Sequence, residues 1–242
     1  MKFISPGELR RLGVLGMNSR NVNYIGATNE RHRFPLVDDK LKTKRLAQDH
    51  GMRVPKLFGV LSIQHEIQSL EKTLEGLDRF VIKPAHGSGG KGILVVCERR
   101  AHEFVKSSGT VISLRDVKRH TSNILSGLYS LGGRTDVAMI EDMIIFDPLL
   151  SDFSYEGVPD IRVIVYQGVV GVGLDIKTGF SARAVQNNAR VDKHPDTGIG
   201  FENLQLPHWQ EILDLACGCY EMTGLGYFGA DIVLDKYRGP MI

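Results

Sequence analysis

The chain has 242 residues, of which 42% are hydrophobic and 24% are charged, a balance that suits a folded globular protein and excludes a disordered or fibrous one. Its 30 basic and 28 acidic residues are spread along the chain and give a net charge of +2, so no basic cluster indicates binding to nucleic acid or to a membrane. The N-terminus lacks the apolar core of a signal peptide, and no apolar run reaches the roughly 18 residues that span a bilayer. We therefore expect a cytoplasmic protein with small-molecule partners.

N-terminal caps mark the starts of the expected helices, and glycines mark their ends. Ser5 is followed by Pro6 and, three residues after the serine, by Glu8, which is a capping box with proline at the first helical position. In chain order, we first expect a helix of about ten residues after Ser5 and a second, capped by Asp38 or Asp39, that ends at Gly51. A third helix, capped by Ser62, carries Ile67, Leu70 and Leu74. A fourth runs from Ser113 to Gly132 and Gly133, and a fifth covers residues 207–222.

The expected strands are β-branched or alternating runs bounded by Gly, Pro or Asp. Val54 and Pro55 mark a strand entry between the second and third helices. The other expected strands cover residues 80–83, 92–97, 137–140, 161–166, 169–174 and 227–234. Because hairpin connections outnumber crossovers, these elements predict an α+β fold, built as one globular unit of tightly joined lobes.

Residues 87–92 read Gly-Ser-Gly-Gly-Lys-Gly and formally match G-x-G-x-x-G. A dinucleotide-binding loop of this type continues into a helix, whereas the β-branched run 93–97 predicts a strand. A Walker A loop ending at Lys91 would need glycine at position 85 and Ser or Thr at 92, where this chain has Ala85 and Gly92. A protein kinase would place its phosphate lysine after the glycine loop, but Lys83 precedes it. What remains is a glycine-rich hairpin between two strands, with a lysine on the first.

A hairpin of this composition can clamp phosphate groups. Lys83 presents a positive charge from a strand, and a loop with few side chains brings backbone N–H groups close to phosphate oxygens. The alternative is a surface hairpin with solvated lysines, and the apolar residues around Lys83 favour the clamp. The predicted clamp consists of Lys83 and the loop residues Gly87, Ser88, Gly89, Gly90, Lys91 and Gly92.

Five blocks in order along the chain resemble the ATP-grasp superfamily, specifically the alpha-L-glutamate ligase-like proteins related to the ribosomal-protein glutamate ligases. The blocks are PLVDDKLKTK at 35–44, FVIKP at 80–84 with the glycine hairpin, MIEDMI at 139–144, GVPDIR at 157–162 and GLGYFGADIVLD at 224–235. The resemblance implies that ATP lies between two α+β lobes, with its phosphates under the hairpin. It also implies an N-terminal segment over 1–35 and an ATP-grasp domain over 36–242, with a glycine-hairpin lobe at about 54–140 and a C-terminal lobe at about 141–242 that lacks family segments.

The matched blocks imply roles for individual residues. Lys44 and Lys83 resemble the nucleotide-contacting lysines of the family, and Asp160 falls where related ligases hold the ribose hydroxyls. Without the other blocks, Lys44 would be interpreted as a solvated helix residue and Asp160 as a turn residue. The hinge that contacts adenine matches Glu141, Asp142, Met143 and Ile144.

Two charged residues of the C-terminal lobe are candidates for catalysis and metal binding. Arg162 alternates with apolar neighbours, and an arginine that faces the cleft can stabilise a transferring phosphoryl group; the alternative is a structural arginine. Asp231 lies in an apolar strand, where an unpaired carboxylate is costly in free energy, so we expect a metal or a cationic partner. The resemblance implies that Asp231 is the first Mg²⁺ ligand.

Two family segments have no counterpart in this sequence. The Glu-x-Asn pair that completes the family's magnesium site would follow Ile242, and a strand with a basic, Asn-bearing segment would follow Val170. Either a natural variant lost both segments or the gene encodes them beyond this sequence, and we expect the second.

The resemblance implies an ATP- and Mg²⁺-dependent carboxylate-amine ligase. ATP would phosphorylate a substrate carboxylate, and an amine from glutamate or a peptide would then displace phosphate to form an amide. The incomplete metal site motivates the alternative, an ATP-grasp relative that binds nucleotide as a regulatory or assembly partner without ligase activity. The sequence identifies neither the two substrates nor the oligomeric state.

Overall fold

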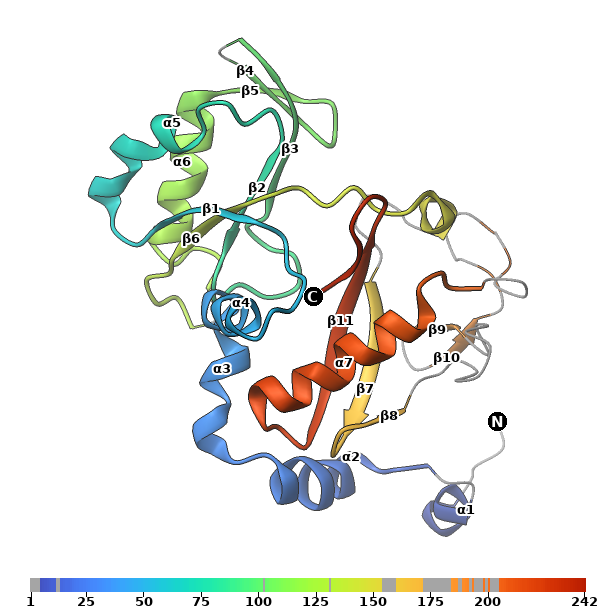
Figure 1. The fold of residues 1–242 in the computed structure, drawn as a ribbon. Helices are drawn as coiled ribbons and strands as arrows, with labels where there is room; N and C mark the ends of the chain where they lie inside the picture. The colour runs from blue at the N-terminus through green and yellow to red at the C-terminus, as the bar shows by residue number, and fades with distance from the viewer. Residues whose placement is uncertain are drawn as a thin grey trace.

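The computed structural model describes residues 5–11, 14–101, 103–130, 132–153, 160–171, 184–186, 189–191, 193, 198, 200 and 205–242. A six-stranded and a four-stranded sheet, each antiparallel and each covered by helices, form the two halves of the molecule, and helix α4 (Lys40–Asp49) lies between them (Figure 1). This architecture confirms the α+β prediction. None of the helices described is both long and apolar enough to cross a bilayer.

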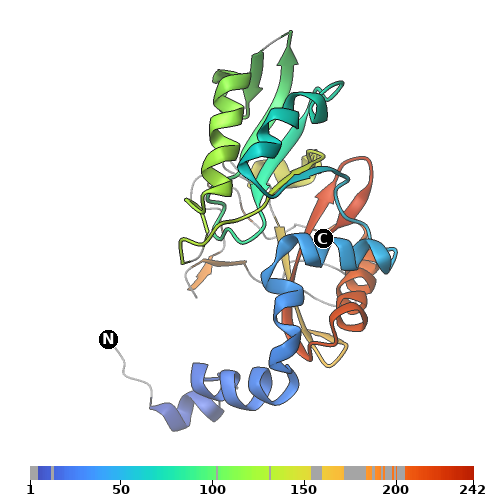
Figure 2. The same ribbon diagram turned by 90° about the vertical axis from the view of Figure 1, so that its left-hand side faces the viewer.

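Short helical segments form the N-terminal part of the chain, which extends along one end of the molecule (Figure 2). They are α1 (Pro6–Arg11), α2 (Met17–Ser19), η1 (Arg20–Gly26), η2 (Arg31–Arg33) and α3 (Pro35–Asp38). The N-cap at Ser5 is confirmed, because its hydroxyl accepts a hydrogen bond from the backbone N–H of Glu8 at 3.2 Å. Asp39, rather than Asp38, caps α4 by accepting hydrogen bonds from two backbone N–H groups.

The six-stranded sheet has the order β1-β6-β2-β3-β4-β5. Its strands are β1 (Leu57–Leu61), β2 (Phe80–Pro84), β3 (Leu94–Arg100), β4 (Glu103–Lys106), β5 (Val111–Ser113) and β6 (Ala138–Glu141). One face packs on η3 (Gln64–Ser69), α5 (Leu70–Thr73) and α6 (Leu114–Leu125). Side chains alternate between the faces of a strand, so Ile82 and Ile140 point into this core while Lys83 and Glu141 point to the other face.

The four-stranded sheet has the order β12-β11-β7-β8. Its strands are β7 (Asp160–Tyr166), β8 (Val169–Gly171), β11 (Tyr227–Asp235) and β12 (Gly239–Met241), and a separate ribbon pairs β9 (Ala184–Gln186) with β10 (Ala189–Val191). Helix α7 (Trp209–Thr223) covers one face, where Val163, Ile212 and Ile232 form part of the core (Figure 1). The opposite face therefore carries Asp160, Arg162 and Asp231.

The chain between β6 and β7 joins the two sheets, and it includes η4 (Pro148–Phe153). The N–H of Lys236 donates to the carbonyl of Ile145 at 2.7 Å, and the N–H of Asp147 donates to the carbonyl of Leu234 at 2.9 Å. The segment that leaves the six-stranded sheet is thus bonded to the end of β11 in the other sheet.

Two helix predictions are wrong in detail. The expected helix after Ser62 is mostly 3-10, and Ser62 does not cap it with its side chain; instead the carboxylate of Glu66 accepts hydrogen bonds from the N–H groups of Ser62 and Ile63. Helix α6 ends at Leu125, before the expected glycine pair, because Gly127 has a φ of +83° and a Cβ there would lie 2.2 Å from the carbonyl oxygen of Arg134.

The strand predictions missed β4, β5, β9, β10 and β12. The strand expected over 169–174 is β8 in its first part, and residues 172–174 lie outside the described part of the chain.

Candidate functional site

The glycine-rich segment joins β2 to β3 as antiparallel neighbours, with Phe80 opposite Val96. The structure therefore confirms a strand, not a helix, after the glycines. Gly89, Gly90 and Gly92 have φ values of +59°, +72° and +78°, a region that disfavours other residues, so this loop depends on glycine at these positions.

Two lysines converge on one buried carboxylate. Lys83 on β2 forms an ion pair with Oε1 of Glu141 on β6, and Nζ of Lys44 on α4 lies 2.8 Å from Oε2 of the same side chain. Nζ of Lys44 also donates to the carbonyl of Pro55 at 2.5 Å. The side chains of Lys44 and Glu141 are only 5% and 4% exposed, so Lys44 is not a solvated helix residue. Burial lowers the pKa of Lys44, whereas its ion pair with Glu141 opposes that change.

Lys40, which the sequence analysis missed, joins this group. It precedes Lys44 by four residues and so shares one face of α4. Its Nζ donates to the carbonyl of Gly87 at the start of the glycine loop. Burial lowers the pKa of Lys40, and the charge of nearby Lys83 lowers it further. The one-turn spacing of the two lysines was the sequence signal that could have identified Lys40. We call Lys40, Lys44 and Lys83 the lysine cluster.

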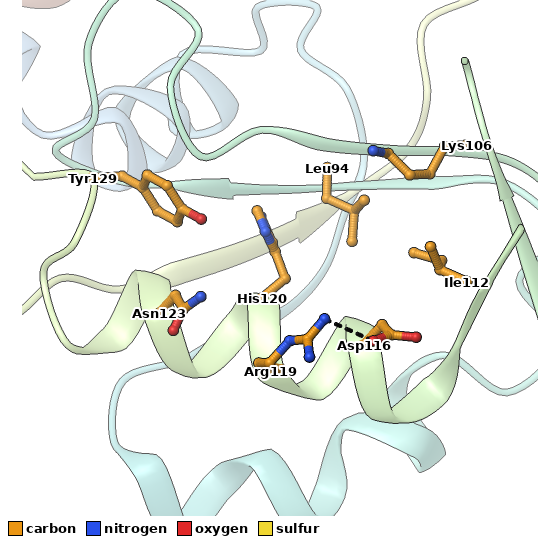
Figure 3. A pocket seen from close by; sticks show the side chains of 8 residues that line it. All are labelled: Leu94, Lys106, Ile112, Asp116, Arg119, His120, Asn123 and Tyr129. Atoms are coloured by element: carbon orange, nitrogen blue, oxygen red, sulfur yellow. Dashed lines mark hydrogen bonds and ion pairs between the residues drawn. The ribbon is translucent and has the colours of Figure 1, made fainter. Parts of the chain in front are cut away.

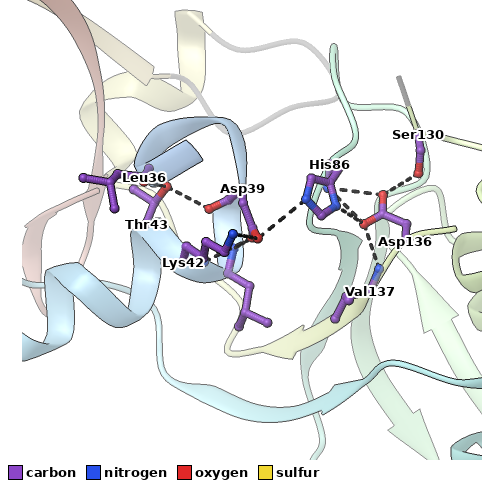
Figure 4. A network of polar contacts seen from close by, with 9 residues as sticks. Leu36, Asp39, Lys42, Thr43, His86, Ser130, Asp136 and Val137 are labelled. Carbon is purple, nitrogen blue, oxygen red and sulfur yellow. Dashed lines mark hydrogen bonds and ion pairs between the residues drawn. The ribbon is translucent and has the colours of Figure 1, made fainter. Parts of the chain in front are cut away.

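The base of the glycine loop is held by a polar network around His86 (Figure 4). Nδ1 of His86 lies 2.8 Å from Oδ1 of Asp136, and Nε2 lies 3.6 Å from Oδ2 of Asp39, the cap of α4. Asp136 also accepts hydrogen bonds from Ser130 at 2.6 Å and from the N–H of Val137 at 2.7 Å. Burial acts to raise the pKa of Asp136, but these hydrogen bonds outweigh it and lower the pKa. The network thus fixes the loop relative to the helix that carries Lys40 and Lys44.

The predicted hinge is bonded to the β11–β12 hairpin by Arg238, a residue that the sequence analysis did not identify. Its guanidinium lies 2.6 Å from Oδ2 of Asp142, 3.2 Å from the carbonyl of Met143 and 2.6 Å from Oδ2 of Asp235. Within the described part of the chain, no group accepts a hydrogen bond from the N–H of Met143 or Ile144.

The C-terminal candidates form a second group on the four-stranded sheet. Arg162 lies opposite Asp231 in the pairing of β7 with β11, and its Nε lies 2.5 Å from Oδ1 of that aspartate. The expected cationic partner of Asp231 is therefore present, although the side chain of Asp231 is 48% exposed on the face away from α7. Burial of part of the carboxyl raises the pKa of Asp231, Arg162 opposes this, and the neighbouring negative charge of Asp160 raises it further.

The two groups are separate. Among the residues that the structure describes, no hydrogen bond or ion pair joins the lysine cluster to Asp160, Arg162 or Asp231, and Lys91 and Ser88 contact neither group through their side chains. The same residues contain no set of three His, Cys, Asp or Glu side chains placed to hold a metal ion.

Several solved structures have a similar fold. Similar solved structures include the VanG D-Ala:D-Ser ligase from Enterococcus faecalis (14% identity, TM-score 0.53, 88% of this chain and 53% of that chain). They also include a phosphoribosylamine-glycine ligase from Thermotoga maritima (14%, 0.52, 89% and 48%) and a D-alanyl-alanine synthetase A from Vibrio cholerae (10%, 0.51, 88% and 56%). At these identities the likeness shows the fold alone. This chain spans about half the length of those proteins.

The sequence comparisons identify the family. No curated protein sequence matches this chain significantly. The matching family model is not that of the glutamate ligase-like proteins, so the assignment to the glutamate ligase-like branch stays a prediction. The model that matches is described as sugar-transfer associated ATP-grasp, and it covers residues 19–169 and 166–242. The chain therefore belongs to the sugar-transfer associated ATP-grasp family.

Proposed function

We propose that this chain binds ATP at the lysine cluster and acts as an ATP- and Mg²⁺-dependent carboxylate-amine ligase. The observation that carries the proposal is the convergence of Lys44 and Lys83 on the single carboxylate of Glu141, with Lys40 reaching the adjoining glycine loop. Lysines that outnumber their carboxylate partner favour an anionic ligand, and a triphosphate would supply the missing negative charge.

The adenine end of the nucleotide would lie at the hinge. Met143 and Ile144 lie two and three residues after Glu141, and no described residue accepts a hydrogen bond from the N–H of either. They can donate to the ring nitrogens of a purine, while the apolar side chains of the hinge cover its faces. Asp142 is engaged by Arg238 at 2.6 Å, so its role is to position the hinge. Asp160 as the ribose contact rests on the sequence resemblance.

The residues on the four-stranded sheet fit a magnesium ion. Asp231 offers carboxylate oxygens, the hard ligands that Mg²⁺ takes, and Mg²⁺ commonly uses one or two carboxylates together with nucleotide phosphates. When bound, the ion would neutralise charge on the phosphates. Arg162 keeps a cation beside Asp231 and would stabilise negative charge that develops on a transferred phosphoryl group.

The chemistry would proceed in two steps. The lysine cluster and the glycine loop hold the triphosphate against the substrate carboxylate, the terminal phosphoryl group moves to a carboxylate oxygen, and ADP leaves. An amine then attacks the acylphosphate carbon, phosphate leaves, and an amide forms after loss of a proton. Glutamate as the amine rests only on the motif resemblance, and the carboxylate substrate is a small molecule or a peptide.

ATP titration by calorimetry tests the binding site. Lys83→Met removes a charge from the cluster, so we expect an affinity lower by about ten- to a hundredfold, the usual effect of losing a hydrogen bond to a charged group. Lys42→Met is the matched control: Lys42 is on α4 between Lys40 and Lys44, but its side chain is 60% exposed. Equal affinities for the two variants, or no ATP binding by the wild type, would contradict the proposal.

ADP release measured with pairs of carboxylates and amines tests the reaction. Release that requires both compounds supports ligation. ATP binding without turnover on any pair would instead support the alternative, a nucleotide-binding relative without ligase activity that acts as a regulatory or assembly partner.

A further inference from the structure

A cavity of about 270 Å³ opens on the α6 side of the six-stranded sheet, the side opposite Lys83 and Glu141 (Figure 3). Its apolar part is formed by Leu94 on β3 and Ile112 on β5. Side chains from β4, from α6 and from the turn after α6 complete it with polar groups: Lys106, His120, Asn123 and Tyr129. The cavity is thus distinct from the proposed nucleotide site.

Three of these polar groups have no partner in the described part of the chain. The ammonium of Lys106 forms no ion pair there, and neither the carboxamide of Asn123 nor the hydroxyl of Tyr129 forms a hydrogen bond. Figure 3 shows the Lys106 ammonium and the Tyr129 hydroxyl directed toward the space around His120. Polar groups that share a cavity without partners are what a ligand with complementary acceptors would satisfy.

The charges of the cavity favour an anion. Arg119 and Asp116, at its edge, pair with each other at 2.8 Å and largely cancel. The charge of Lys106 is left uncompensated. Burial lowers the pKa of His120, its contact with the carbonyl of Gly92 opposes this, and the charge of Lys106 lowers the pKa further. An anion beside Lys106 would neutralise the charge that helps to lower the pKa of His120.

The cavity adjoins the glycine loop. Nε2 of His120 lies 2.9 Å from the carbonyl oxygen of Gly92, and the rings of His120 and Tyr129 are 5.5 Å apart. A Cβ on Gly92 would lie 2.5 Å from the Tyr129 ring, so Tyr129 packs directly against the end of the loop. A ligand here would touch the side chains that hold this end of the loop.

We propose that this cavity is a second ligand site, which binds a compact oxyanion, a carboxylate or a phosphate group, attached to a small apolar moiety. Lys106, Asn123 and the Tyr129 hydroxyl donate to the oxyanion, and the apolar moiety lies against Leu94 and Ile112. The site needs no nucleotide, so it stands or falls independently of ATP binding.

Calorimetric titration with benzoate and with phenyl phosphate tests this site and distinguishes the two oxyanions, with neutral benzamide as the matched probe. We expect saturable binding of at least one anion and none of benzamide. Lys106→Gln should weaken the binding by about tenfold or more, and Tyr129→Phe by several-fold, because each removes one donor. Lys118→Gln is the control and should bind as the wild type does, since Lys118 lies on the same α6 outside the cavity and pairs with Glu71.

Three results would overturn the proposal: saturable binding of neither anion to the wild type, equal affinities for Lys106→Gln and Lys118→Gln, or loss of binding in Lys83→Met with retention in Lys106→Gln. The last result would place the probes at the lysine cluster. Circular dichroism of each variant confirms that a lost affinity is not a lost fold.

Discussion

Glu141 is the residue on which the proposed nucleotide site depends, because its carboxylate is the shared partner of Lys44 and Lys83. Glu141→Gln would leave Lys44, whose side chain is 5% exposed, without its anionic partner. Removing one member of a buried ion pair typically costs about 3 to 5 kcal/mol, so we expect the free energy of unfolding to fall by about 3 kcal/mol. Urea unfolding at neutral pH measures this.

Glu98→Gln is the control for that prediction, because Glu98 pairs with Arg100 on the surface and its side chain is 52% exposed. We expect Glu98→Gln to leave the free energy of unfolding nearly unchanged, because an exposed ion pair contributes little to stability. Similar losses for the two glutamates would show that the lysine cluster does not require Glu141.

Asp235 makes the stability depend on pH. Burial alone would raise its pKa, but hydrogen bonds from Arg238 and from the N–H groups of Tyr237 and Ile145 lower it from the ordinary 3.8 to about 2. Because the folded-state pKa lies below the unfolded value, the contribution of Asp235 is complete above about pH 4 and is lost as the pH falls toward 2.

We therefore expect the wild type to lose more stability than Asp235→Asn between pH 5 and pH 2, by roughly 1 to 2 kcal/mol. Chemical unfolding at a series of pH values checks this, with Asp78→Asn, a change at an exposed aspartate, as the control. Parallel pH profiles for the wild type and Asp235→Asn would contradict it.

The glycine loop, at the scale of an element, is constrained differently at its tip and at its end. Gly89 and Gly92 both have positive φ, but a Cβ on Gly89 would meet nothing within 4 Å, whereas a Cβ on Gly92 would lie 2.5 Å from the Tyr129 ring. Gly89→Ala should cost about 1 kcal/mol from backbone strain alone. We expect Gly92→Ala to cost at least about twice as much, and thermal unfolding of both variants tests the difference. Equal costs would mean that Tyr129 moves away freely.

The two sheets are connected, at the scale of the whole molecule, through Arg238. Its guanidinium binds Asp142 at the end of the six-stranded sheet and Asp235 at the end of β11, next to the hydrogen bonds that join Ile145 to Asp235 and Lys236. Arg238→Met should therefore let this junction open more often, and we expect amide hydrogen exchange at Ile145 and Lys236 to accelerate by about tenfold or more.

Arg100→Met, which removes an exposed arginine far from the hinge in sequence, is the control and should leave that exchange unchanged. Unchanged exchange in Arg238→Met would mean that backbone hydrogen bonds alone hold the junction.

The sequence by itself determined the features that depend on neighbouring residues. The cap at Ser5, the strand after the glycine loop and the glycine end of α7 were all predictable, because capping, side-chain alternation and left-handed glycine are local properties of the backbone. The same local patterns, taken together, predicted the α+β fold.

Only the tertiary structure decided which charged groups meet. Lys40 reaches Gly87, 47 residues away, and Arg238 reaches Asp142, 96 residues away, and no local pattern encodes such contacts. For the same reason the exposure of Asp231 could not be predicted: its apolar neighbours show that its strand is packed, but only α7 decides which face is covered. Burial and charge pairing arise from packing between distant segments, so they follow from the fold and not from the residues on either side.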